Sequence, residues 1–141
     1  YMPTQFDWRV GVLGGEPLFA SQYKMARGHW QIAKQDKDGG LSFGGVSTVA
    51  VDSAPKSVIE TAVRAARLIG DGLYGIDLKE NERGVFVIEI NDNPNLDHDD
   101  EGEVLKDELW RRIIKWFESR LEKRMGGASA AALSPLAATQ P

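Results

Sequence analysis

The sequence predicts an α+β fold in which an antiparallel sheet of two hairpins is packed with two helices. Two observations indicate the sheet: apolar runs that alternate like β-strands occur in pairs, and a short polar or glycine-containing turn joins each pair. A third observation indicates the helices, because two longer segments repeat their apolar residues at helical spacing. With 141 residues, the chain has room for one domain with a sizeable core.

The first hairpin is expected between residues 8 and 25. Residues 8–13 alternate as a strand, 14–17 supply a turn in Gly-Gly-Glu-Pro, and 18–25 return. The chain then passes through a basic and aromatic stretch and a glycine-rich loop before a short strand at 46–51. Loops of this glycine content on a rigid hairpin either hold ligands or are solvated connections, and the sequence leaves both interpretations open.

Two helices complete the predicted fold, and both are expected on one face of the sheet. Pro55 suits the first turn of a helix over 55–69, and Gly70 ends it. The last helix is expected over 104–123, with apolar residues on one side and charged residues on the other. Residues 125–141 are rich in Ala, Gly, Ser and Pro, and with so few large apolar groups we expect them to form a disordered tail.

The second hairpin carries the most informative polar residues of the chain. Residues 72–78 and 85–91 are apolar runs joined by a polar segment. Folded about that turn, Asp77 falls nearly opposite Glu89, and Asn91 shares the face of Glu89 because side chains alternate along a strand. Two carboxylates and an amide oxygen on one face form a hard-oxygen cluster suited to Mg²⁺. The alternative is that each is the ordinary polar end of a strand.

Composition excludes several other classes of function. The formal net charge of −4 and the lack of Lys or Arg runs argue against a nucleic-acid partner. The absence of cysteine removes disulfides, thiolate zinc sites and a cysteine nucleophile. No apolar run approaches the ~20 residues of a membrane span, and the N-terminus lacks the basic region of a signal peptide. We therefore expect a soluble, cytoplasmic protein with no membrane partner.

Other charged residues allow two interpretations each. Asp7 and Arg9 share a face at the start of a strand and form either a cross-strand or local ion pair, or a ligand contact. Lys24 and Arg27 are either solvated or in contact with phosphate. The acidic run at 97–101 lacks the spacing and the glycine of an EF-hand, so we expect a solvated loop near the substrate side.

Four segments together carry a family signature: FDWRVG at 6–11, KMARGHWQI at 24–32, GDGLYGID at 70–77 and EINDNP at 89–94. With these segments the chain resembles the C-terminal half of an ATP-grasp domain of the RimK-like carboxylate-amine ligases. The match covers nearly all of residues 1–124, which would form that subdomain. Its most specific part is the Asp followed by Glu-x-Asn.

The resemblance implies roles for individual residues by their positions in these motifs. The magnesium ligands of the family match Asp77, Glu89 and Asn91, with Mn²⁺ as an alternative ion. The expected catalytic residues are Arg9 and Lys24. The expected contacts to the nucleotide are Asp7, Lys24, Arg27 and Ile90.

The resemblance also implies an activity. The family joins a carboxylate to an amine through an acyl phosphate, so ATP, a carboxylate substrate and an amine acceptor are the expected partners, the acceptor being an amino acid, a peptide or a protein. Metal ions would neutralise phosphate charge while basic side chains stabilise the same oxygens. Asn93 and Asn95 would lie near the acceptor, and a homo-oligomer is a further expectation.

Two departures qualify the expected activity. Where relatives carry Arg-x-Asn at the nucleotide, this chain has Gln31-Ile32-Ala33. The preceding half of the family's domain, with the lysines and the glycine-rich loop that cover ATP, is absent from the sequence, so we expect the parent protein to be the ligase and the chain alone to be inactive. Two alternatives stay open: a non-catalytic binding or oligomerisation module derived from ATP-grasp, and a kinase-like phosphotransferase.

Overall fold

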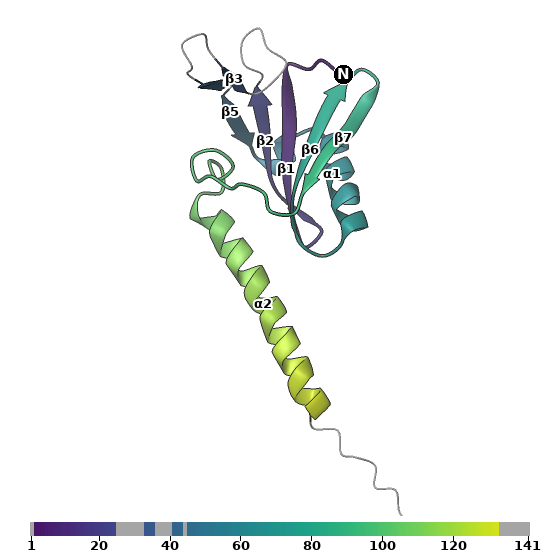
Figure 1. Ribbon diagram of the computed structural model, residues 1–141, viewed down its shortest axis with the longest axis vertical. Helices are drawn as coiled ribbons and strands as arrows, with labels where there is room; N and C mark the ends of the chain where they lie inside the picture. Colours follow the sequence, from purple (N-terminus) through teal and green to yellow (C-terminus); the bar gives the residue numbers. More distant parts are fainter. Residues whose placement is uncertain (1, 25–32, 36–40, 44, 133–141) are drawn as a thin grey trace, which may run out of the picture.

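The computed structural model describes residues 2–24, 33–35, 41–43 and 45–132, and it confirms the predicted α+β fold. The strands are β1 (Phe6–Leu13), β2 (Glu16–Lys24), β3 (Ala33–Gln35), β4 (Leu41–Phe43), β5 (Val46–Val49), β6 (Leu73–Asn81) and β7 (Gly84–Asn91). The helices are η1 (Val51–Ser53), α1 (Lys56–Ile69) and α2 (Asp107–Ala132). Five strands form one antiparallel sheet in the order β5-β2-β1-β6-β7, with α1 against it and α2 extending away from one end (Figure 1).

Two glycines form the tight turn of the first hairpin. Gly14 and Gly15 join β1 to β2 with φ angles of 60° and 82°, a region that residues with a Cβ rarely adopt. Positive φ at both central positions matches the two-residue turn that suits the twist of a hairpin. Along its other edge β1 pairs with β6, which brings the first hairpin against the second.

The register of the second hairpin confirms the predicted acidic pair. Asp77 on β6 is the pairing partner of Glu89 on β7, and Asn91 pairs with Gly75. Gly75 allows the chain just past β7 to fold back, because a Cβ on this glycine would come within 2.8 Å of the Cβ of Pro94. The end of β7 is therefore held closely against the start of β6.

The segment between β2 and α1 has more regular structure than the sequence indicated. β3 and β4 pair with each other as a separate two-stranded sheet. β5 joins the edge of the main sheet beside β2 and confirms the short third strand, although that strand ends at Val49. Val51, the last residue of the predicted strand, instead begins the 3₁₀ turn η1, and Ala50 is the N-cap of that turn.

Helix α1 encloses the main core against one face of the sheet, which we call the α1 face. The helix follows Pro55, which is its N-cap, and ends at Gly70, so the prediction over 55–69 is confirmed within one residue. Its apolar side meets alternate residues of β1, β2 and β6. The members of this core with no exposed surface are Val10, Val12, Ala20, Val58, Ala62, Ile76 and Leu78. Burying each large aliphatic side chain contributes about 1.5–3 kcal/mol, so this layer holds the sheet together.

Helix α2 packs on the opposite face of the sheet from α1, so the expectation that both helices share one face is wrong. Leu109 and Ile113 of α2 form a second core cluster with Leu13 and Phe19. Leu13 points away from α1 because it follows Val12, which belongs to the α1 face. Val12 and Leu13 of β1 are both apolar, so each face of the sheet has apolar surface. The helical pattern alone therefore does not indicate which face α2 covers.

Both ends of α2 differ from the prediction. It begins at Asp107, because residues 98–106 form turns in which Lys106 has a positive φ of 51°. It runs to Ala132, so residues 125–132, expected within a disordered tail, are helical. Alanine has the highest helix propensity, and an existing helix extends at little cost, which explains the difference.

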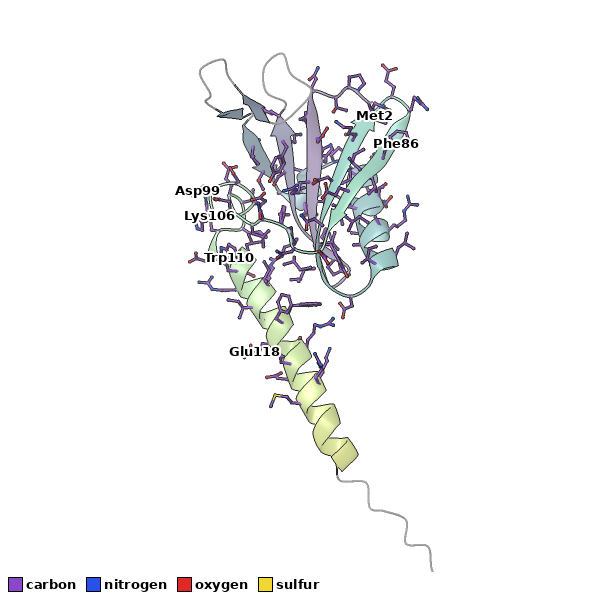
Figure 2. All side chains as sticks on the ribbon, viewed as in Figure 1. Met2, Phe86, Asp99, Lys106, Trp110 and Glu118 are labelled. Carbon is purple, nitrogen blue, oxygen red and sulfur yellow. The ribbon has the colours of Figure 1, made fainter. Side chains whose placement is uncertain are left out.

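The outer part of α2 projects from the body of the protein. Trp110 lies at the junction with the sheet and Glu118 lies farther out on the projecting helix (Figure 2). The exposed apolar residues of this part are Ile114, Phe117, Leu121 and Met125. In the described ranges, no helix has both the length and the apolar character required to cross a membrane.

Candidate functional site

The face of the sheet turned away from α1 carries most of the charged residues that the sequence singled out. They alternate with the core residues along β1, β6 and β7. We call this surface the charged face, and it consists of Asp7, Arg9, Asp77, Lys79, Glu89 and Asn91. Arg9 is the register partner of Asp77, which is in turn the register partner of Glu89. These three residues therefore lie in a row across three strands.

Arg9 binds Asp77 through two parallel hydrogen bonds. Nε of Arg9 donates to Oδ1 of Asp77 at 2.7 Å, and Nη2 donates to Oδ2 at 2.8 Å. This forked geometry suits a guanidinium and a carboxylate, and the two side chains are 21% and 23% exposed. The hydrogen bond to Asp77 raises the pKa of Arg9 further above its ordinary value, although burial opposes the shift. Arg9 is therefore charged at every physiological pH.

Asp7 pairs with Lys79 on the neighbouring strand. Nζ of Lys79 donates to Oδ1 of Asp7 at 2.6 Å, and Oγ1 of Thr4 donates to the same oxygen at 2.7 Å. Asp7 and Arg9 are thus not partners of each other, because each finds its opposite charge across the β1–β6 pairing. The interpretation of these residues as cross-strand ion pairs is correct for both, with partners that the sequence did not identify.

The oxygen donors of Asp77, Glu89 and Asn91 have the chemistry that Mg²⁺ requires. Glu89 is exposed, while Asn91 is half-buried and its Oδ1 accepts the backbone N–H of Asn93 at 2.9 Å. Arg9 bonds both oxygens of Asp77, but an ionised carboxylate has about four lone-pair sites, so acceptor capacity is left over. One guanidinium beside two carboxylates leaves an excess of negative charge. These donors fit a hard divalent cation.

The predicted set of metal ligands has few members. Among the residues that the structure describes, no three acidic, histidine or cysteine side chains gather as they do around a metal ion. The predicted set instead combines two carboxylates with one amide. Mg²⁺ commonly binds through one or two carboxylates and takes its other ligands from water and substrate phosphates. The assignment of Asp77, Glu89 and Asn91 as ligands stays a prediction.

Two residues expected at the nucleotide occupy register positions of the α1 face. Lys24 pairs with Phe6, and Ile90 pairs with Ile76, both of which belong to that face. Lys24 is exposed at the last position of β2, whereas Ile90 packs against the core. The strands therefore do not bring these two side chains into the row of charges. Arg27, also expected at the nucleotide, lies outside the described residues.

The sequence pattern did not indicate a buried carboxylate that lies beside the charged face. Glu101 belongs to the acidic run at 97–101, which was expected to be solvated, yet it is 2% exposed. The hydroxyl of Tyr23 donates to its Oε1, and the backbone N–H of Asp97 donates to its Oε2 at 2.9 Å. The other acids of the run are exposed as expected. Tyr23 was the available signal, because it shares the strand face of Ser21 and Asp7 and carries a hydroxyl.

The loop that contains Glu101 is anchored on the outer strands of the sheet. Oγ1 of Thr48 donates to the carbonyl of Asp100 at 2.7 Å, and Ser21 shares a hydrogen bond of 2.6 Å with the same Oγ1. The backbone N–H of Thr48 donates to Oε2 of Glu103 at 3.4 Å. Burial, followed by the charge of Glu101, raises the pKa of Asp100. The loop thus covers the β2–β5 side of the sheet and leaves the charged face on the β1–β6–β7 side.

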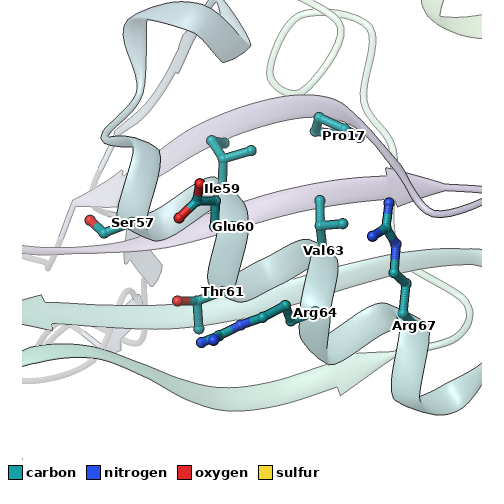
Figure 3. A pocket seen from close by; sticks show the side chains of 8 residues that line it. All are labelled: Pro17, Ser57, Ile59, Glu60, Thr61, Val63, Arg64 and Arg67. Atoms are coloured by element: carbon teal, nitrogen blue, oxygen red, sulfur yellow. The ribbon is translucent and has the colours of Figure 1, made fainter.

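Several hollows in the described part of the chain have the size of ligand pockets, and two of them lie on opposite sides of the sheet. One, of about 490 Å³, lies between the start of β6, residues 92–94 and α2, and Asn93 lines it while Asn95 does not. The other, of about 460 Å³, lies on the outside of α1 against Pro17, with Arg64 among its lining residues (Figure 3). The first hollow adjoins the end of β7 and the charged face. The second lies on the far side of the sheet.

Comparisons with known proteins agree with this architecture. The chain is 34% identical over 91 residues to a "probable alpha-L-glutamate ligase" of Xanthomonas euvesicatoria, a match that covers 64% of this chain and 28% of the relative. It is 32% identical over 122 residues to a protein of the same name from Syntrophotalea carbinolica, covering 85% of this chain and 38% of the relative. The chain thus spans well under half the length of these curated relatives. No family model matches it.

Solved structures show the same fold. D-alanine–D-alanine ligase from Bacillus anthracis superposes with a TM-score of 0.60 at 14% identity, covering 87% of this chain and 42% of that protein. The ATP-grasp ligase PsnB, complexed with a phosphomimetic variant of a minimal precursor, Mg and ADP, superposes with a TM-score of 0.51 at 19% identity, covering 79% and 34%. The chain therefore has an ATP-grasp fold and resembles in sequence a part of the RimK-like ligases, as the motifs indicated.

Proposed function

We propose that this chain is the magnesium- and phosphate-binding part of an ATP-dependent ligase that joins a carboxylate to an amine through an acyl phosphate. The observation that supports this most is the row of Arg9, Asp77 and Glu89, where a permanent cation and hard oxygen donors lie side by side. The relatives in sequence and the neighbours in structure carry ligase names, which also supports the proposal.

Asp77, Glu89 and Asn91 would hold Mg²⁺, with Mn²⁺ as a substitute. When bound, the ion would neutralise the negative charge on the phosphates. The solved complexes of proteins with this fold, one with ATP and one with Mg and ADP, support a site for both in this chain. The exposed position of Glu89 would leave space for water and phosphate as further ligands.

Arg9 is the first proposed catalytic residue. Its guanidinium is charged at all relevant pH values and would stabilise the oxygens of the transferring phosphoryl group. Lys24 is the second, and its exposed position at the end of β2 would let its long side chain turn toward phosphate. Asp7, Arg27 and Ile90 complete the proposed contacts to the nucleotide.

The proposed substrates are ATP, a carboxylate and an amine that belongs to an amino acid, a peptide or a protein. The hollow beside Asn93 adjoins the strand end that carries Glu89 and Asn91, which supports it as the approach of the acceptor. We also propose a cytoplasmic location, where ATP is available to the reaction.

Titration of the chain with Mn²⁺, followed by electron paramagnetic resonance, tests the metal site. We expect Mn²⁺ binding that Mg²⁺ displaces, and its loss in Asp77→Asn and in Glu89→Gln, because each change removes an anionic oxygen donor. Glu82→Gln is the matched control, since it removes the same charge from the exposed turn of the same hairpin. Equal weakening in Glu82→Gln and Glu89→Gln would contradict the site, because total charge alone would then explain binding.

The reaction class is tested on a protein of the relatives' length that contains this chain. Hydroxylamine added with ATP, Mg²⁺ and a mixture of carboxylates should yield a hydroxamate, because it intercepts an acyl phosphate. The Arg9→Met protein should yield far less, since the phosphoryl oxygens would lose their fixed cation. Release of ADP with a phosphorylated product and no hydroxamate would favour the phosphotransferase alternative.

One observation favours a second candidate function, self-association. The exposed residues Ile114, Phe117 and Leu121 follow one side of the projecting part of α2, a spacing typical of helix pairing. Sedimentation analysis would show a dimer that Phe117→Glu dissociates. A chain that binds neither Mn²⁺ nor ATP and forms such a dimer would replace the ligase proposal with an interaction module.

A further inference from the structure

Glu101 is a buried carboxylate with no role in the proposed reaction. It is 2% exposed, and its oxygens accept the Tyr23 hydroxyl and the Asp97 backbone N–H. Neither of these partners carries a positive charge. Burying an ionised carboxylate is costly unless an opposite charge compensates it. A positively charged side chain is therefore expected to interact with Glu101.

Tyr23 connects Glu101 to Arg9. Nη1 of Arg9 approaches the Tyr23 hydroxyl oxygen at 3.5 Å, and Cζ of Arg9 lies 4.8 Å from the centroid of the Tyr23 ring. The Tyr23 hydroxyl in turn donates to Glu101. The donors therefore point in one direction, from Arg9 through Tyr23 to Glu101, and hydrogen bonds in such a series strengthen one another.

The guanidinium of Arg9 is thus held from two sides. Asp77 binds Nε and Nη2 directly, whereas Glu101 acts on the remaining nitrogen, Nη1, through Tyr23. The two supports differ in exposure, because Asp77 is 23% exposed and Glu101 is buried. Asp77 is also a proposed metal ligand, whereas Glu101 is enclosed by its loop.

We infer that Glu101 is a positioning residue, which acts through Tyr23 to keep Arg9 on the charged face when Asp77 turns to a metal ion. The effect on a bound metal ion rests on the proposed function, whereas the contacts among Glu101, Tyr23 and Arg9 are independent of that function. A divalent cation bound to Asp77 would weaken the attraction between Asp77 and Arg9 and would repel the guanidinium. The negative charge of Glu101 then holds Arg9 over the Tyr23 ring, within reach of the phosphates.

Nuclear magnetic resonance of the chain tests the inference without metal. In Asp77→Asn the direct partner of Arg9 is neutral, and we expect the Arg9 side-chain signals to keep the ring-current shift caused by Tyr23. In Asp77→Asn/Glu101→Gln that shift should collapse toward the value of an unfolded chain. Asp77→Asn/Tyr23→Phe should release Arg9 as well, because it breaks the series at its middle member.

Glu103→Gln is the matched control for Glu101→Gln, since it removes the same charge from the same loop at an exposed position and keeps an oxygen that can accept the backbone N–H of Thr48. In the Asp77→Asn background it should leave the Arg9 shift in place. Unchanged signals from the buried Val10 and Ile76 would show that each variant is folded. A shift that survives Glu101→Gln, or that Glu103→Gln also abolishes, would overturn the inference.

The metal-dependent consequence is measured by Mn²⁺ titration. Glu101→Gln should weaken Mn²⁺ binding about fivefold, because Arg9 then depends on Asp77 alone and competes with the ion. In an Arg9→Met background the same change should have no effect, and a loss that persists there would overturn the inference. Absence of Mn²⁺ binding in the wild-type chain would contradict the proposed function instead, and the metal-free comparison would still decide the role of Glu101.

Discussion

The two faces of the main sheet are made by the same strands and have opposite characters. On the α1 face, Val10 and Ile76 are fully buried in an aliphatic core. On the charged face, their sequence neighbours Arg9 and Asp77 form an ion pair that is about one fifth exposed. A register slip of one residue would exchange these two sets of side chains. Burial of the apolar face therefore fixes the register, and this register places the charged residues opposite one another.

The largest expected effect comes from the α1 face. Ile76→Ala should lower the free energy of unfolding by about 3 kcal/mol, because it removes a fully buried side chain and leaves a cavity. Urea denaturation measures the change. Mn²⁺ binding by the molecules that are still folded should be close to that of the wild type. A loss of that binding larger than the loss of folded protein would show that the two faces are not separable.

A smaller effect is expected where the two hairpin ends meet. Gly75→Ala should cost about 1–2 kcal/mol, because the new Cβ would lie 2.8 Å from the Cβ of Pro94 and the turn after β7 must move. Gly45→Ala is the control, since a Cβ there meets no atom within 4 Å. Thermal denaturation compares the two variants, and equal melting temperatures would mean that the turn adjusts freely.

A side chain of the charged face should contribute less to stability than the buried side chain next to it in the sequence. Asp77→Asn should lower the free energy of unfolding by about 1.5 kcal/mol, because Arg9 loses a charged hydrogen-bond partner while the packing stays intact. The same variant should lose Mn²⁺ binding, the reverse of the pattern expected for Ile76→Ala. Denaturation at low and high salt measures the ionic share, and a cost as large as that of Ile76→Ala would erase the contrast between the faces.

The smallest effect is expected at alkaline pH. Burial, followed by Glu101, raises the pKa of Tyr23 above its ordinary value of 10.0, so the folded chain keeps this proton after the unfolded chain has lost it. Below pH 10 both states are protonated and nothing changes. Above pH 10 the unfolded state binds fewer protons, so the free energy of unfolding falls as pH rises. Tyr23→Phe should flatten this decline, measured by urea denaturation, whereas the control Tyr74→Phe should retain it.

Much of the charged face could be predicted from local sequence. The turn between β6 and β7 is short, and strand alternation is strict, so Asp77 opposite Glu89 followed from the pattern and was confirmed. Helix α1 could be predicted for the same reason, since its boundaries depend on Pro55 and Gly70. These features depend on interactions between residues that are close in the chain.

The remaining features depend on residues that are far apart. Arg9 meets Asp77 across 68 positions, and Tyr23 meets Glu101 across 78. No local pattern shows that Glu101 is buried or that α2 lies opposite α1, because both depend on which apolar surface of the finished sheet is left to cover. The sequence by itself determined the two hairpins, helix α1 and the pairing of Asp77 with Glu89. Only the tertiary structure decided the partners of the charges, because long-range packing chooses among faces that the alternation of side chains makes equally available.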